Sequence, residues 1–186
     1  MDVALTPVPE LTTERLRLVP LGPEHLEGTW VALQDPEVLR LTGTHASFTR
    51  DGVAAWLAGL SARDDRADWA ILRAGDDEHI GEVVLNDPDA DNRSAGFRIA
   101  LGAPRWFGAG YGTEATRAVL AHAFTTLGLH RVELEVYAFN PRAQRAYEKA
   151  GFELEGRRRD ALRWDGEWVD TLVMGCLSNV ETQQED

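Results

Sequence analysis

Three glycines in one short segment of the sequence create a place where an anion could bind. The segment is Gly108-Ala109-Gly110-Tyr111-Gly112-Thr113, and a pattern typical of a long helix follows it. Glycine has no Cβ, so the backbone N–H groups of such a segment can approach a ligand closely, and the start of the helix adds unpaired donors and the positive end of its dipole. Phosphate groups bind at such junctions. A plain turn before a helix would use the same residues, so the glycines alone leave both interpretations open.

A second segment, from Asn140 to Phe152, could supply polar groups to the same ligand. Asn140 is a favourable N-cap, Pro141 suits the first helical position, and Gly151 suits a helix end. Tyr147 follows Asn140 by almost two helical turns, so both side chains lie on one face, about 10 Å apart along the axis. A face of this length could follow a linear ligand. For Tyr147 the alternative is a half-buried ring with a solvated hydroxyl.

The elements that would position these segments are those of a single α+β domain. We expect strands at 12–21, 69–74, 79–86, 94–101 and 131–139, helices at 23–33, 49–63, 112–127 and 141–150, and two final strands around the turn Asp165-Gly166. The strands between 69 and 101 form an antiparallel meander. The pattern therefore predicts a mixed, mostly antiparallel sheet flanked by helices, in a domain at 11–178 between an N-terminal tail at 1–10 and a polar C-terminal tail at 179–186.

Composition excludes several classes of partner. The chain has 19 Lys and Arg against 31 Asp and Glu, and this net charge of −12 argues against nucleic acid and weakly favours a cationic substrate. The N-terminus lacks a basic region followed by an apolar run, and no apolar segment is long enough to span a bilayer, so we expect a cytoplasmic protein without a membrane partner. The five histidines show no metal-ligand spacing, and we expect no metal.

Three further residues have plain structural interpretations. Cys176, the single cysteine, cannot form an intramolecular disulfide and is typical of a small core residue. Trp164 and Trp168 flank the predicted two-residue turn, where we expect them to pair across the strands. The alternative is that they wall a ligand pocket, which aromatic side chains often do.

Taken together, the motifs resemble those of the GNAT superfamily of N-acyltransferases, specifically its RimJ/RimL-like branch. A T-x-R-L-x-L strand, a G-x-G-Y-G-T-E-A loop, an N-x-x-A-x-x-x-Y-E-K-A-G-F helix and a D-G-x-W-x-D hairpin occur in family order. The resemblance implies the GNAT fold, in which the fourth and fifth strands, here 94–101 and 131–139, splay apart. It further implies acetyl-CoA as co-substrate, with the pantetheine arm between those strands. Similar proteins are commonly homodimers.

The resemblance also assigns residues to the coenzyme. The pyrophosphate would lie on the loop formed by Gly108, Ala109, Gly110, Tyr111, Gly112 and Thr113. Asn140 would contact the pantetheine arm, and Tyr147 would stand near the sulfur. Phe107 occupies the position where the family usually has Arg or Gln, unless Arg105 takes that role in a shifted alignment. We include both among the candidate coenzyme-binding residues.

The chemistry itself requires three kinds of group. An amine attacks the thioester carbonyl, negative charge develops on the oxygen, and a thiolate leaves, so donors to the oxygen and a proton for the sulfur both assist. Tyr147 is the predicted proton donor, and unpaired backbone N–H groups of 94–101 are the predicted oxyanion donors. Glu82, in the strand at 79–86, is the candidate base that deprotonates the amine, and Asp170 is a second candidate. The alternatives are a solvent-facing carboxylate for Glu82 and a hairpin-orienting one for Asp170.

The sequence thus predicts an acetyl-CoA-dependent N-acetyltransferase that acts on a primary amine of a small molecule or a protein N-terminus. Ala143 and Leu162 stand where ribosomal-protein acetyltransferases of the branch carry Ser and Glu, which argues against a ribosomal substrate. A rival is a CoA-binding sensor or interaction module that keeps the fold without turnover. A Rossmann domain is disfavoured, because the G-x-G-x-x-G spacing fails at Thr113.

Overall fold

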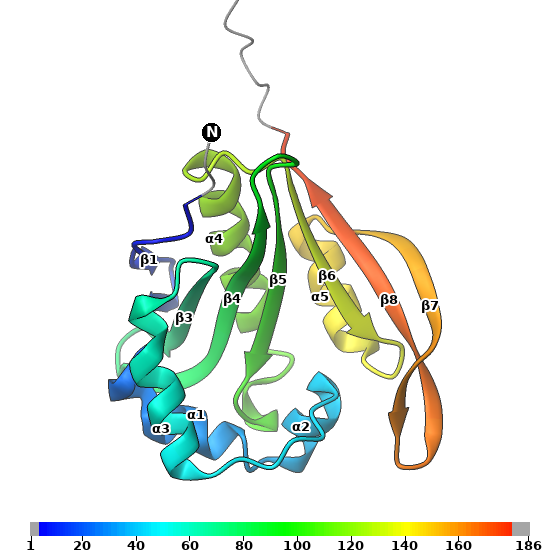
Figure 1. The fold of residues 1–186 in the computed structure, drawn as a ribbon, viewed down its shortest axis with the longest axis horizontal. Coiled ribbons are helices and arrows are strands. Elements are labelled where there is room, and N and C mark those ends of the chain that lie inside the picture. The colour runs from blue at the N-terminus through cyan, green and yellow to red at the C-terminus, as the bar shows by residue number, and fades with distance from the viewer. Residues whose placement is uncertain (1–3, 180–186) are drawn as a thin grey trace, which may run out of the picture.

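The computed structural model describes residues 4–179, which build one eight-stranded sheet (Figure 1). Its strands lie in the order β1-β2-β3-β4-β5-β6-β8-β7, and only the β5–β6 pair is parallel. The sheet is therefore mixed and mostly antiparallel, as the sequence predicted. The strands are β1 (Leu11–Thr12), β2 (Leu16–Pro20), β3 (Arg66–Arg73), β4 (His79–Asp89), β5 (Ser94–Leu101), β6 (Arg131–Tyr137), β7 (Glu153–Trp164) and β8 (Glu167–Leu177).

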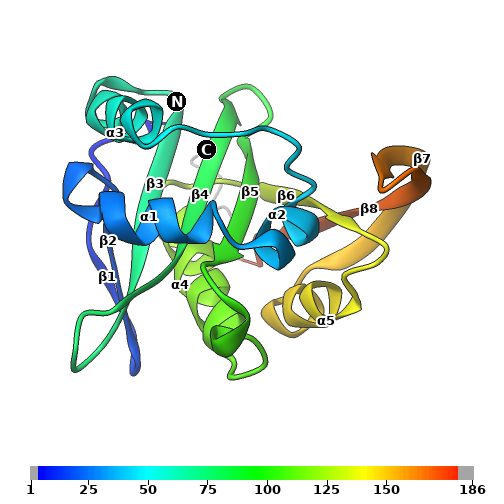
Figure 2. The ribbon, with the colours of Figure 1, turned by 90° about the horizontal axis from the view of Figure 1, so that it is seen from below.

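Helices cover both faces of the sheet. They are α1 (Leu26–Ala32), α2 (Pro36–Thr42), α3 (Arg50–Gly59), α4 (Tyr111–Thr125) and α5 (Pro141–Ala150). Figure 2 shows α4 and α5 on one side of the sheet and α1 and α3 on the other. The helix predicted at 141–150 is confirmed with its bounds. The one predicted at 23–33 is instead divided into a 3₁₀ turn, Pro23–His25, and the α-helix α1.

The short helix α2 was not predicted, although its ends carry clear signals. The Asp35 side chain caps it by accepting from the N–H groups of Glu37 and Val38 at 2.9 and 3.0 Å, and Gly43 ends it in the left-handed conformation. Seven residues are too few to display a helical period. Gly43 also packs closely on β6, since a Cβ there would lie 2.4 Å from the Tyr137 hydroxyl. The end of α2 thus rests against β6.

The strands β5 and β6 form a wedge, because they pair only at one end. Ser94, Ala95 and Gly96 face Arg131, Val132 and Glu133, and beyond these three pairs the two strands diverge (Figure 1). β5 stays paired with β4 on its other side, and β6 with β8. The backbone groups that face the wedge from β5 and β6 therefore have no strand partner there. This confirms the predicted splay, which falls between β5 and β6 because Leu11–Thr12 forms an additional short strand.

Alternation along β5 sends successive side chains to opposite faces of the sheet. Ala95 and Phe97 are buried in the main core, to which α4 and α5 also contribute residues such as Val119 and Tyr147. A smaller cluster on the opposite face joins β3 to α3, through residues such as Ala70 and Leu57. The face of the sheet that α4 and α5 cover is therefore closed and apolar, and the opposite face is more open.

The hairpin of β7 and β8 turns at Asp165 and Gly166, both at positive φ, as the sequence predicted. The expected pairing of the two tryptophans is wrong. A two-residue turn places Trp164 opposite Glu167 and Trp168 opposite Arg163, so the two rings lie on opposite faces of the ribbon. Trp164 stacks on His45 with ring centroids 4.8 Å apart, and Trp168 is exposed.

The described part of the predicted N-terminal tail is packed against the domain. Leu5 is only 1% exposed and belongs to the main core, and the Pro9 carbonyl accepts a hydrogen bond from the Trp69 indole N–H at 2.7 Å. The short segment around Leu5 shows neither a helical nor a strand period, so the burial of Leu5 could not be predicted. The C-terminal tail predicted at 179–186 lies almost wholly outside the described residues. Within residues 4–179, none of the helices has the length and apolar composition that a bilayer span needs.

Replacing Leu5 tests this packing. We expect Leu5→Ala to lower the free energy of unfolding by about 2 to 5 kcal/mol, the range for a large buried aliphatic side chain truncated to alanine. Leu154→Ala is the matched control, because Leu154 is 54% exposed and should change stability little. Urea unfolding of both variants measures the difference. Equal stabilities would contradict a core position for Leu5.

Candidate active site

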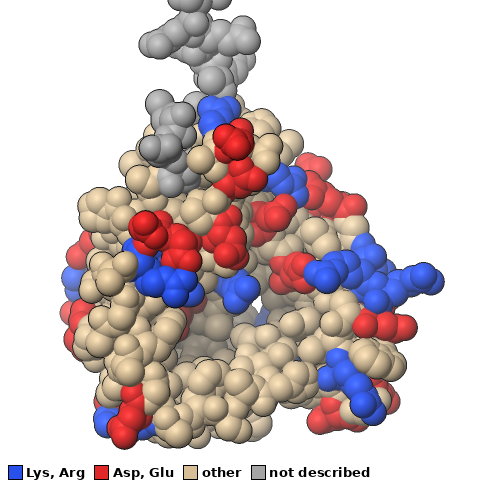
Figure 3. Space-filling model, viewed as in Figure 1, with Lys and Arg blue, Asp and Glu red and all other residues tan. Residues whose placement is uncertain are grey.

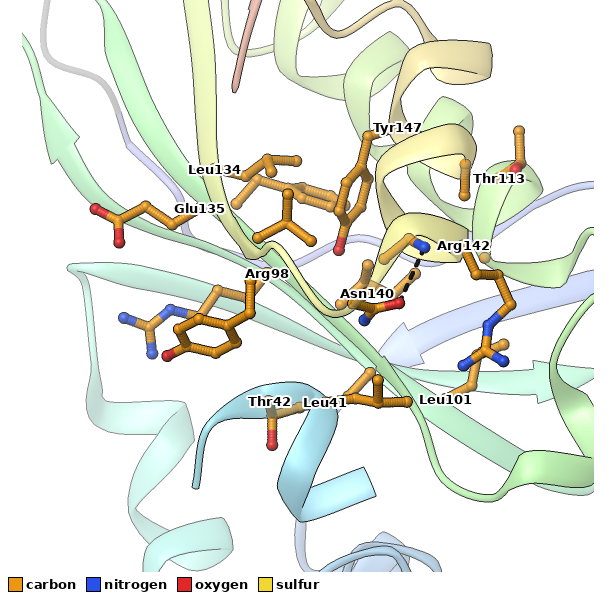
Figure 4. Close-up of a pocket in the computed structure, with 18 of the residues that line it drawn as sticks. Leu41, Thr42, Arg98, Leu101, Thr113, Leu134, Glu135, Asn140, Arg142 and Tyr147 are labelled. Carbon is orange, nitrogen blue, oxygen red and sulfur yellow. Dashed lines mark hydrogen bonds between the residues drawn. The ribbon is translucent and has the colours of Figure 1, made fainter. Parts of the chain in front are cut away.

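A cavity of about 760 Å³ occupies the wedge (Figure 4). β5 and β6 form two of its walls, the glycine segment before α4 and one face of α5 form a third, and α2 closes it on the opposite side. Figure 4 shows Leu41 and Thr42 of α2 facing Asn140 and Tyr147 of α5 across this space. The two sequence segments that could bind a ligand therefore lie on one cavity.

The glycine segment begins α4 in the way that anion binding requires. Gly108 and Gly110 have φ values of 77° and 87°, and Gly110 is the N-cap of α4 without a side-chain hydrogen bond to the first turn. Such positive φ values favour glycine. Gly108, Gly110, Gly112 and Thr113 line the cavity, whereas Ala109 and Tyr111 do not. The first-turn N–H groups of α4 are thus free of a side-chain cap and lie at the cavity wall.

The T-x-R motif of the N-terminal region holds this segment in place. Glu114 accepts hydrogen bonds from the Thr13 hydroxyl at 2.6 Å, the Arg15 backbone N–H at 2.9 Å and Arg15 Nε at 2.7 Å. Arg15 Nη1 also donates to the Ala109 carbonyl at 2.9 Å. Partial burial tends to raise the pKa of Glu114, but these hydrogen bonds outweigh it and lower the pKa. Sequence reasoning recognised the motif and missed its function, which is to clamp the loop.

Asn140 and Tyr147 both line the cavity, as their spacing on one helical face predicted. Asn140 Oδ1 caps α5 by accepting from the Ala143 N–H at 3.1 Å. The Tyr147 ring packs against Phe97 and Phe152, with centroids 6.3 and 5.9 Å away, while its hydroxyl points into the cavity (Figure 4). Burial raises the pKa of Tyr147, so the phenol keeps its proton at neutral pH. It can therefore act as a proton donor.

Three cations on α5 were missed by sequence reasoning. Arg142, Arg145 and Lys149 line the cavity on the helical face that their spacing of three and four residues predicts. The Arg142 guanidinium lies 4.0 Å from the centre of the Phe107 ring. Phe107 therefore carries no charge of its own to the site and instead makes a cation–π contact with Arg142. Phe107 lines the cavity as well. These residues can neutralise an anion at the start of α4.

Arg105 and Glu82 lie instead on a second cavity of about 430 Å³. Arg105 donates to Glu78 at 3.1 Å and does not line the wedge. The two cavities adjoin, because residues of α2 and its following loop, together with Ala100 and Trp106, line both. Ala100 of β5 is the register partner of Glu82 on β4. Glu82 therefore lies one strand away from the wedge.

The surroundings of Glu82 make it a group that titrates near neutral pH. Its Oε1 accepts a hydrogen bond from the Thr29 hydroxyl, and its side chain is 29% exposed to the second cavity. Burial raises the pKa of Glu82 to about 7, against the weaker opposing effect of Thr29. The nearby His79, whose Nε2 is 3.9 Å from Glu82 Oε1, is neutral at this pH, because burial lowers its pKa to about 4. Glu82 can thus accept a proton at neutral pH.

Asp170 has a structural role. It accepts from the Asp160 N–H at 2.9 Å and forms an ion pair with Arg157, and these contacts lower its pKa. It lines neither cavity. Of the two carboxylates considered as bases, only Glu82 faces a cavity. In the part of the chain that the structure describes, no three His, Cys, Asp or Glu side chains form a group that could hold a metal ion.

Comparison with known proteins agrees with this geometry. Residues 15–153 match the family model described as "Acetyltransferase (GNAT) domain". The chain belongs to the GNAT family. It resembles the putative acetyltransferase of T. thermophilus at 32% identity and a TM-score of 0.74, over 90% of this chain and 88% of that one. Spermidine N-acetyltransferase from Vibrio cholerae, solved with CoA and spermine, shares the fold at a TM-score of 0.81 and 24% identity, over 89% and 97% of the two chains.

Relatives found by sequence carry the same family activity in their names. The uncharacterized N-acetyltransferase p20 of Bacillus licheniformis is 29% identical over 90% of this chain and 95% of its own length. The FsC-acetyl coenzyme A-N(2)-transacetylase of Aspergillus fumigatus is 34% identical over 71% of this chain, which spans only 60% of that protein. The GNAT protein is accordingly an N-acetyltransferase by family, with acetyl-CoA as co-substrate.

Removing the loop clamp should weaken coenzyme binding. We expect Arg15→Ala to raise the dissociation constant for CoA about tenfold, which equals ~1.4 kcal/mol, because Ala109 and Glu114 lose the side chain that orders the loop. Arg17→Ala is the control, since Arg17 lies on the adjoining strand β2 and pairs with Glu10 and Asp77, away from the cavity. Titration calorimetry measures both. Equal affinities in the two variants would refute the clamp.

Proposed function

We propose that the protein transfers an acetyl group from acetyl-CoA to the primary amine of a small molecule or a protein N-terminus, by direct attack on the thioester. The observation that carries this proposal is the cavity in the wedge, which joins an uncapped helix start, a buried tyrosine and unpaired strand edges. Family membership supports the reaction class. The RimJ/RimL-like motifs of the sequence support that branch as part of the same proposal.

The residues around the cavity would divide the work as follows. The N–H groups at the start of α4, with Arg142 and Arg145, would hold the pyrophosphate. Asn140 would contact the pantetheine arm. The β5 backbone beyond Gly96, which lacks a partner on β6, would donate to the oxygen on which negative charge develops.

Two side chains would move protons. Tyr147 would protonate the departing sulfur, because its neutral phenol faces the cavity and its burial disfavours the phenolate. Glu82 would take the proton of the acceptor amine, across the boundary that the two cavities share. A primary alkyl amine is mostly protonated at pH 7, so a base with a pKa near 7 is suited to this step.

The names of relatives support an amine acceptor. Spermidine N(1)-acetyltransferase of Vibrio cholerae is 34% identical over 100 residues, which is 54% of this chain and 57% of that protein. A thiol-release assay with acetyl-CoA and a broad panel of amines tests the proposal, with CoA binding measured by calorimetry. We expect release that depends on an amine. Binding without transfer would instead favour a CoA sensor with this fold, and absence of binding would contradict both.

Replacing the proposed acid should separate catalysis from binding. We expect Tyr147→Phe to lower kcat by about 10²-fold or more, since the leaving thiolate loses its proton donor, while the dissociation constant for CoA changes little. The aromatic ring, and with it the packing on Phe97, is retained. Unchanged turnover in Tyr147→Phe would remove Tyr147 from the mechanism.

The role of Glu82 predicts a pH dependence. Because the pKa of Glu82 is raised to about 7, the carboxyl group is protonated and inactive below that pH, and kcat/KM should rise as it ionises through that value. Glu82→Gln should lower kcat/KM at pH 8 about 10²-fold and abolish this inflection. Asp170→Asn should preserve the inflection, because Asp170 faces neither cavity. An inflection that persists in Glu82→Gln would exclude Glu82 as the base.

A further inference from the structure

The mechanism above gives no role to Arg98, a cation on the cavity wall. Arg98 of β5 lines the wedge cavity and is exposed. We infer that the acceptor carries an oxyanion, a carboxylate or a phosphate, in addition to its amine, and that Arg98 binds this group. The inference rests on the proposed function and names the class of its acceptor.

Arg98 lies on the side of the sheet opposite to Tyr147. Phe97, its neighbour along β5, is buried and contacts Tyr147 on the face covered by α4 and α5. Alternation therefore directs Arg98 to the open face, on the side of α1 and α3. Figure 3 shows this face hollowed at the sheet, and Figure 4 shows Arg98 beside the wedge, near Glu135 of β6. An acceptor that approaches from the open face would meet Arg98.

The guanidinium of Arg98 has no carboxylate partner among residues 4–179. The two acidic side chains of β6 that line the cavity form ion pairs with other arginines. Glu133 pairs with Arg131 at 3.1 Å, and Glu135 pairs with Arg158. Most other arginines of this chain, whose net charge is −12, form ion pairs. Asp87 of β4 also lines the cavity, where it accepts a hydrogen bond from Asn86 and forms no ion pair with Arg98. The Arg98 guanidinium is thus left without an ion pair on this wall, and a planar guanidinium binds a carboxylate or phosphate through two parallel hydrogen bonds.

The coenzyme does not account for this charge. Its phosphates have a place at the start of α4, where Arg142 and Arg145 line the cavity. Those residues belong to helices on the face opposite to Arg98 (Figure 2). The oxyanion that reaches Arg98 thus belongs to the other substrate.

The positive charge of Arg98 also disfavours a polyamine as the acceptor. Its second ammonium group would meet the Arg98 guanidinium, and like charges repel. The acceptor preferred by this chain would therefore differ from that in the name of the Vibrio cholerae relative. The charge of Arg98 would thus distinguish acceptors that carry an oxyanion from polyamines.

Matched pairs of amines test the inference on the intact protein. The pairs are an amino acid and its amide, an aminoalkyl phosphate and its amino alcohol, and, as the opposite class, a diamine. We expect the wild type to prefer the acidic member at least tenfold in kcat/KM, mainly through KM, and whichever acid is preferred identifies the anion as carboxylate or phosphate. Arg98→Ala should abolish the preference, and Arg98→Glu should shift it toward the diamine.

Arg159→Ala serves as the matched control, because Arg159 is an exposed arginine that lines neither cavity. It should retain the wild-type preference. Acetylation of both members at equal kcat/KM, or a preference that survives Arg98→Ala, would overturn the inference while leaving the acetyltransferase proposal intact. CoA binding without transfer to any amine would overturn the two together. CoA affinity that falls in Arg98→Ala would assign Arg98 to the coenzyme and also overturn the inference.

Discussion

The parting of β5 and β6 is the constraint on which the rest of the site depends. Three register pairs hold the strands together, after which β5 remains bound to β4 and β6 to β8. Each strand therefore keeps one hydrogen-bonded partner along the gap. The backbone groups left facing the gap are available to a ligand, which is the condition for binding an extended chain between strands.

The other parts of the site are fixed relative to that gap by contacts distant in sequence. Thr13 and Arg15 hold Glu114, and through it the start of α4. Gly43 brings the end of α2 against Tyr137, so α2 forms one wall of the gap. The glycine segment and the α2 wall of the gap are thereby positioned by different elements.

Burial sets the chemical character of the ionisable groups. Tyr147 has its pKa raised by burial and stays neutral, whereas Glu82, partly exposed to its own cavity, has its pKa raised by burial to about 7. One group is therefore kept as an acid and the other is poised to become a base. Arg98, exposed and without an ion-pair partner among the described residues, adds a charge whose only evident use is recognition.

The sequence by itself determined what local signals encode: the glycine loop, the bounds of the helix from Pro141 to Ala150, the hairpin turn at Asp165-Gly166 and the order of the longer elements. These depend on neighbouring residues, through φ preferences, caps and periodicity. Only the tertiary structure decided that Leu5 is buried, that Arg15 clamps the loop, that Glu82 and Asp170 have different surroundings, and that Arg98 lacks a carboxylate partner among residues 4–179. Burial and ion pairing depend on residues far away in the sequence, and no local pattern encodes such contacts.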